Sequence, residues 1–103
     1  MQVIQFHRDH CTRLAVGDAG YFVLENQGQT LAVPDKCPHR GGPLHLGQLS
    51  DCSRKLVCPW HDTAFPIASL AKRALPTLRS GQRLTVLAPP GAVKLWREPL
   101  PHL

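Results

Sequence analysis

The sequence predicts a small all-β fold. Ten prolines and eight glycines interrupt short apolar runs, and this punctuation suits strands and turns while it prevents long helices. No segment keeps a 3.6-residue apolar period over three turns, which is the pattern that a long amphipathic helix requires. A chain of 103 residues is expected to form one domain, so we assign residues 1–103 to a single unit.

The expected strands are short apolar runs bounded by turn residues. Residues 26–29 form the expected hairpin turn, in which Gly28 supplies a positive φ. A single helical turn is expected near residues 43–46, because proline suits a helix start, and the tail 99–103 is expected to fray. The strands are expected at residues 3–6, 12–16, 21–25, 30–34, 55–58, 63–65, 84–88 and 92–96.

Positive charge is concentrated in the last part of the chain. There are 12 Lys and Arg against 7 Asp and Glu, a net charge of +5, and residues 63–103 carry all of the excess. Such a basic region is either simply solvated or a docking surface for an acidic partner, and the sequence favours neither. The basic residues in it are Lys72, Arg73, Arg79, Arg83, Lys94 and Arg97.

No apolar run approaches the roughly 20 residues needed to span a bilayer. The N-terminal residues MQVIQFHRDH lack the basic start and long apolar stretch of a signal peptide. We therefore expect a cytoplasmic protein without a membrane partner. Four cysteines in that compartment are read as metal ligands rather than as disulfides.

Two Cys–His pairs stand out. Cys37 and His39 form one pair, Cys58 and His61 form the other, and 18 residues separate His39 from Cys58. Each pair places a soft thiolate beside an imidazole in one tight loop, and four such ligands hold either one zinc ion or one binuclear iron–sulfur cluster. A proline follows each cysteine and presets a turn. The glycine pair 41–42 allows the backbone to approach a bulky inorganic core.

The stretches Cys37-Pro-His-Arg-Gly-Gly-Pro-Leu44 and Leu56-Val-Cys-Pro-Trp-His61 resemble the paired cluster loops of the Rieske family. The match is strongest over residues 31–70, within its ferredoxin and oxygenase branch. It implies a small β-sandwich of antiparallel sheets with a cluster-binding subdomain made of two loops, about residues 36–46 and 56–66. It also implies a [2Fe–2S] cluster. The two cysteines would hold the buried iron, and the two histidines would hold the outer iron at the exposed edge.

The sequence departs from the family pattern at several positions. The gap between the two pairs is about one residue longer than usual, which suggests a slightly longer loop around residues 50–54. Asp62 stands where the family usually has glycine, and Asp tolerates left-handed φ better than most residues. The respiratory branch joins its two loops by a disulfide, but the matching residues here are Gly42 and Trp60, so that disulfide is excluded.

Seven residues are expected to form the cluster environment. Arg40 lies beside the electron exit, Pro43 covers the cluster, and Trp60 either shields it or touches a partner. Thr63 and Phe65 match a serine and a tyrosine that donate hydrogen bonds in high-potential relatives. Because Phe65 has no hydroxyl group, we expect a potential in the lower half of the Rieske range of roughly −150 to +300 mV. The full set is Arg40, Gly41, Gly42, Pro43, Trp60, Thr63 and Phe65.

The remaining cysteines and histidines are expected to have ordinary roles. Cys11 and Cys52 are interpreted as small side chains, and a disulfide between them is the alternative. His45 is expected to be solvated, with a proton-coupled role near the cluster as the alternative, and His102 is expected at the surface. Trp96 is expected to pack in the core or on an edge strand.

The resemblance implies an electron carrier, expected to be a monomer, that passes electrons from a reductase to a terminal oxygenase. It would not be an enzyme itself, because a mononuclear non-haem iron site needs two histidines and a carboxylate, and the other histidines lack that spacing. A small subunit or regulatory module of a larger redox enzyme is one alternative. A zinc-stabilised interaction module that binds nucleic acid is another. We expect no nucleic-acid partner, because few aromatics lie among the basic residues.

Overall fold

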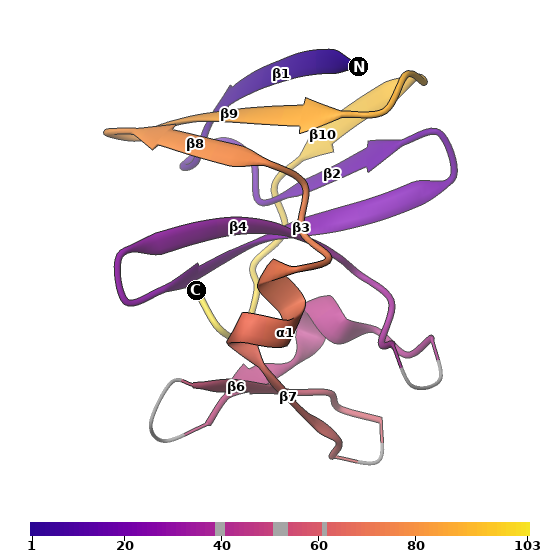
Figure 1. The fold of residues 1–103 in the computed structure, drawn as a ribbon, viewed down its shortest axis with the longest axis vertical. Helices are drawn as coiled ribbons and strands as arrows, with labels where there is room; N and C mark the ends of the chain where they lie inside the picture. Colours follow the sequence, from indigo (N-terminus) through magenta and orange to yellow (C-terminus); the bar gives the residue numbers. More distant parts are fainter. Residues whose placement is uncertain (39–40, 51–53, 61) are drawn as a thin grey trace.

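The computed structural model describes residues 1–38, 41–50, 54–60 and 62–103. Its strands form three antiparallel sheets stacked in layers (Figure 1), as the predicted all-β class requires. A 3₁₀ turn, η1 (Leu44–Leu46), and a short helix, α1 (Ile67–Ala71), complete the elements. Within the described residues, none of the helices has the length and apolar character that a membrane crossing demands.

The first sheet has the order β1-β9-β8 and contains β1 (Gln2–His7), β9 (Arg83–Ala88) and β8 (Thr77–Ser80). The central sheet has the order β10-β2-β3-β4 and contains β10 (Val93–Trp96), β2 (Arg13–Val16), β3 (Ala19–Asn26) and β4 (Gln29–Pro34). The third sheet has the order β5-β6-β7 and contains β5 (Gln48–Leu49), β6 (Lys55–Val57) and β7 (Ala64–Pro66).

The central sheet is buried on both faces. In β1, buried Ile4 and Phe6 alternate with exposed residues, which is the pattern of a strand with one face in water. In β3, the residues from Tyr21 to Leu24 are all buried. A strand with a period of two can bury four residues in a row only if each face is covered by a different layer.

One core cluster lies between the first sheet and the central sheet. It includes Leu14 and Val23 from the central sheet and Leu84 and Val86 from β9. Cys11 also lies in this cluster and is 3% exposed. Its thiol donates to the Arg13 carbonyl at 3.0 Å, so it is a small buried side chain, as expected.

The second core cluster covers the opposite face of the central sheet. It joins Phe22 and Leu24 of β3 to the third sheet, to α1 and to the C-terminal segment. Cys37 and Cys58 are members of this cluster. The two candidate cysteine ligands are therefore built onto a packed interior.

Several predicted features are found in the structure. Every expected strand has a counterpart, and the turn at 26–29 places Gln27 and Gly28 at φ 50° and 82°. The one-turn helix expected near 43–46 is η1, and Trp96 lies on the edge strand β10. The expectations missed β5, β8 and α1.

The prediction that residues 99–103 fray is wrong. Leu100 is buried in the second core cluster, and the Leu103 amide donates to its carbonyl at 3.1 Å. His102, expected at the surface, lies 3.2 Å from the Val23 carbonyl through Nε2. Its ring meets Phe22 edge-on, with the two centroids 5.2 Å apart.

Candidate metal centre

The two predicted cluster loops are built in the same way. The Cys37 amide donates to the Gly42 carbonyl at 2.8 Å, and the Cys58 amide donates to the Thr63 carbonyl at 2.8 Å. Both bonds span five residues and start at the cysteine. Each loop is therefore a single closed turn that presents its cysteine from a fixed backbone.

Each of these turns has a left-handed residue four positions after its cysteine. These residues are Gly41, with φ 72°, and Asp62, with φ 50°. Glycine adopts this region without strain, and Asp is among the few other residues that occupy it readily. The structure confirms that Asp62 adopts the left-handed conformation expected of it.

The first loop, residues 36–46, follows β4 and folds back on itself. Lys36 and Pro43 form an isolated antiparallel bridge, and the Leu44 amide donates to the Asp35 carbonyl at 2.9 Å. The second loop connects β6 to β7, which pair in register from Lys55–Pro66 to Val57–Ala64. Thus the loop that carries Cys37 extends from the central sheet, and the loop that carries Cys58 belongs to a hairpin of the third sheet.

The thiols of Cys37 and Cys58 meet where the two loops approach each other. Their residues are 5% and 0% exposed. Burial raises the pKa of the Cys58 thiol, a hydrogen bond from the Trp60 backbone lowers it, and the neighbouring Cys37 side chain raises it further. Both cysteines are thiols rather than partners in a disulfide.

Gly42 and Trp60 are the second point of contact between the loops. A Cβ atom added at Gly42 would lie only 2.8 Å from Cδ2 of the Trp60 ring, so glycine is the residue that fits beneath this indole. Trp60 remains 52% exposed. The positions that carry a disulfide in the respiratory branch are thus occupied by a packed ring, a role that the sequence alone did not indicate for Gly42.

Some of the predicted site residues lie outside the described part of the chain. These are His39, His61 and Arg40, together with the spare Cys52. Pro43 and Thr63 are half-buried within the loops, while Phe65 packs partly buried against the second core cluster. The structure therefore brings together the two cysteines, the glycine pair and Trp60.

His45 is not solvated as the sequence suggested. Its side chain is 16% exposed, and its Nε2 lies 3.6 Å from the Glu98 carboxylate. Burial and the nearby Arg13 guanidinium lower the pKa of His45, while Glu98 and Asp35 act in the opposite direction. Sequence reasoning missed this charged group because its members are far apart along the chain.

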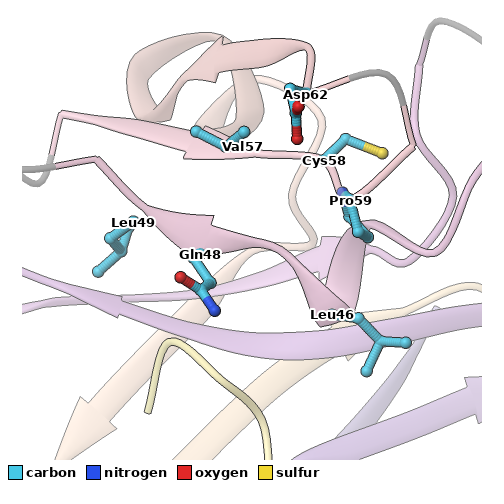
Figure 2. Close-up of a pocket in the computed structure, with 7 residues that line it drawn as sticks. All are labelled: Leu46, Gln48, Leu49, Val57, Cys58, Pro59 and Asp62. Carbon is cyan, nitrogen blue, oxygen red and sulfur yellow. The ribbon is translucent and has the colours of Figure 1, made fainter.

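A pocket of about 450 Å³ adjoins the second loop. Figure 2 shows the Cys58 sulfur pointing away from Gln48 and Leu49, which lie on the opposite side of this view. Of the two cysteines, Cys58 is among the described residues that line it and Cys37 is not. The lining residues are Leu46, Gln48, Leu49, Val57, Cys58, Pro59 and Asp62.

The donor chemistry of the loops suits a thiolate-bound metal centre. Two adjacent buried sulfurs favour zinc or an iron–sulfur core over the hard cations that prefer oxygen. The described part of the chain has no convergent set of three or more His, Cys, Asp or Glu side chains. The two thiols therefore require further ligands, and the resemblance assigns that role to His39 and His61.

Comparisons with known proteins agree with this chemistry. The model of the Rieske [2Fe-2S] domain family matches residues 1–94. A human Rieske domain-containing protein is 36% identical over 56 residues, which are 52% of this chain and 36% of that protein. Mouse apoptosis-inducing factor 3 is 34% identical over 64 residues, which are 62% of this chain and 10% of the relative.

A vanillate O-demethylase oxygenase subunit from Pseudomonas sp. (strain HR199 / DSM 7063) is 51% identical over 35 residues, which are 34% of this chain and 9% of that subunit. The chain thus spans about a third or less of each of these curated relatives. No solved structure matches the chain significantly.

Proposed function

The chain belongs to the Rieske [2Fe-2S] domain family, and we propose that Cys37, His39, Cys58 and His61 hold its cluster for one-electron transfer. The observation that carries this proposal is the meeting of two buried thiols from two matched loops. When bound, the cluster supplies the redox chemistry. Histidine in place of two thiolates raises its potential relative to an all-cysteine cluster.

The residues of the chain have distinct roles in this proposal. The buried cysteines would anchor the group against the second core cluster and would keep water from that side. Burial raises the pKa of the Cys58 thiol and the Trp60 backbone hydrogen bond opposes that shift only in part, so binding of the metal would have to displace the thiol proton. The histidines would face outward and form the edge at which electrons enter and leave.

We further propose that the chain is an electron carrier between a reductase and a terminal oxygenase. The local similarity to an oxygenase subunit supports an oxygenase system as the setting. The family match over residues 1–94 supports one Rieske domain as the working unit. In this proposal the chain is a cytoplasmic monomer without its own catalytic site.

Metal analysis and ligand variants test the ligand assignment. The purified protein should be brown, contain iron and sulfide, and give a rhombic EPR signal on reduction. Cys37→Ser, Cys58→Ser and His39→Ala should lose the normal cluster and part of the thermal stability, because a cluster held by two loops cross-links a small domain.

Cys11→Ser is the matched control. Cys11 is equally buried, and burial raises the pKa of its thiol. However, Cys11 belongs to the other core cluster, and its thiol donates a hydrogen bond to the Arg13 carbonyl. Loss of colour in Cys11→Ser would overturn the ligand assignment. A colourless wild-type protein with stoichiometric zinc would favour the structural zinc module instead.

A further inference from the structure

Arg13 of β2 is a buried cation with several partners. Its side chain is 8% exposed and pairs with Asp35 at 2.5 Å and with Glu98 at 3.0 Å. Its Nε donates to the Tyr21 carbonyl at 3.2 Å, and its guanidinium lies 4.9 Å from the centroid of the Trp96 ring. Burying a charge is costly unless it is fully paired, so this group fixes its carboxylate partners in place.

Those partners lie at both ends of the first cluster loop. Asp35 immediately precedes the loop, and its carbonyl accepts the Leu44 amide at 2.9 Å. At the other end, His45 lies 3.6 Å from the second carboxylate oxygen of Glu98. Arg13 is therefore linked, through the carboxylates of Asp35 and Glu98, to both ends of the first cluster loop.

Glu98 belongs to the C-terminal segment, residues 97–103, which lies beyond the family match ending at residue 94. Two hydrogen bonds fix the backbone of Glu98. Its amide donates to Thr12 Oγ1 at 2.8 Å, and the Thr12 hydroxyl donates to the Glu98 carbonyl at 2.7 Å. Leu100 then enters the core cluster that contains Cys37 and Cys58. The segment is thus held on the central sheet at one end and packed against the candidate site at the other.

We propose that Arg13 and Glu98 are positioning residues for the first cluster loop, and that segment 97–103 is an integral part of the site in this chain. The expected effect of these residues on the loop follows from the contacts described above. Their expected effect on the cluster rests on the proposed function. Loss of the Glu98 charge should loosen the turn at residues 41–46 and change the surroundings of the cluster.

The test compares Glu98→Gln with Glu25→Gln. Glutamine keeps the size of Glu98 and the two Thr12 bonds, which use only the backbone of residue 98, so the variant is expected to fold. Glu25 is a matched carboxylate, since it also pairs with arginines, namely Arg8 at 2.6 Å and Arg79 at 3.9 Å. Arg8 follows β1 and Arg79 lies on β8, and neither arginine belongs to a cluster loop.

Hydrogen exchange and the cluster signal are the readouts. In Glu98→Gln, protection of the Leu44 amide should fall by about tenfold relative to strand β3, and the midpoint potential and EPR g values should shift. Glu25→Gln should lower the melting temperature while leaving Leu44 protection, potential and g values unchanged. Equal behaviour of the two variants in these readouts would overturn the proposal.

The same experiment separates this inference from the proposed function. If the wild-type protein contains no iron–sulfur cluster, the proposed function fails, and the exchange measurement still decides whether Glu98 holds the loop. If the cluster is present and Leu44 protection does not respond to Glu98→Gln, only the positioning role fails.

Discussion

At the scale of single residues, the two left-handed positions explain how unlike sequences form the same turn. Gly41 and Asp62 occupy equivalent places in the two loops, at φ 72° and 50°. The left-handed backbone of Asp62 was predictable from the sequence because Asp tolerates this region, whereas for Gly41 the sequence predicted only a close approach of the backbone to the cluster. The packing of Trp60 on Gly42 was not predictable, because it depends on how the loops face each other.

Replacing Asp62 tests this account of the second loop. We expect Asp62→Ala to lower the free energy of unfolding by about 1 kcal/mol, since a left-handed backbone costs that much for residues with an ordinary Cβ. Asp62→Gly should be at least as stable as the wild type. Thermal unfolding of the cluster-loaded protein measures both changes.

The control is Asp18→Ala, which removes an exposed Asp from the turn between β2 and β3, at a position without positive φ. Its effect should be small. An Asp62→Ala variant as stable as Asp62→Gly would show that the left-handed backbone does not limit this loop.

At the scale of elements, the sequence predicted the strands with clear apolar patterns and missed the shortest or most exposed ones. β8 has one half-buried residue followed by three exposed ones, so no alternation reveals it. β5 has two residues and α1 has five, which is too short for a periodic pattern. These elements are stabilised by contacts with neighbouring layers. Such contacts join residues far apart in the sequence, so a local sequence pattern does not reveal them.

The C-terminal segment failed as a sequence prediction for the same reason. Its residues Pro99 to Leu103 look like an unconstrained tail, yet Leu100 and His102 pack on elements that lie far away in the sequence. Burial lowers the pKa of His102, and the nearby His45 lowers it further, while the carbonyls of Val23 and Gly47 oppose the shift. The folded protein therefore prefers the neutral imidazole.

This preference predicts a pH-dependent stability. Because the folded-state pKa lies below the ordinary value of about 6.5, the unfolded chain binds more protons as pH falls through that value. The stabilisation is present above pH 6.5 and is lost progressively below it. His102→Gln, which can still donate to the Val23 carbonyl, should flatten the loss of stability between pH 7 and pH 5.5.

Urea unfolding followed by tryptophan fluorescence measures this slope in the two proteins. His10→Gln, a change at an exposed histidine, is the control and should keep the wild-type slope. A slope that is unchanged in His102→Gln would show that the tail does not hold a neutral histidine.

At the scale of the whole molecule, the three layers separate the candidate site from two of the six basic residues of the C-terminal region. Arg79 and Arg83 lie on β8 and β9, in the first sheet, whereas the hairpin that carries Cys58 belongs to the third sheet. Figure 1 shows these layers on opposite sides of the central sheet. Charge in the first sheet would attract an acidic partner toward the wrong end of the domain.

Two exposed apolar side chains, Trp60 and Leu46, lie in or beside the second loop. Trp60 is 52% exposed and Leu46 is 40% exposed, and aromatic residues of this kind dominate the energy of many protein interfaces. We therefore expect contact through Trp60, rather than steering by the basic third, to control electron transfer between this chain and its redox partner.

Stopped-flow kinetics with that partner test the expectation. Trp60→Ala should slow electron transfer by about tenfold, corresponding to about 1.4 kcal/mol of contact energy, while the visible spectrum of the cluster stays unchanged. Leu78→Ala is the control, because Leu78 is 76% exposed but lies on β8 in the first sheet. The wild-type rate should be nearly independent of salt, since a contact that buries apolar surface is not screened by ions as paired surface charges are. A rate that falls steeply with salt and is unaffected by Trp60→Ala would instead assign docking to the basic residues.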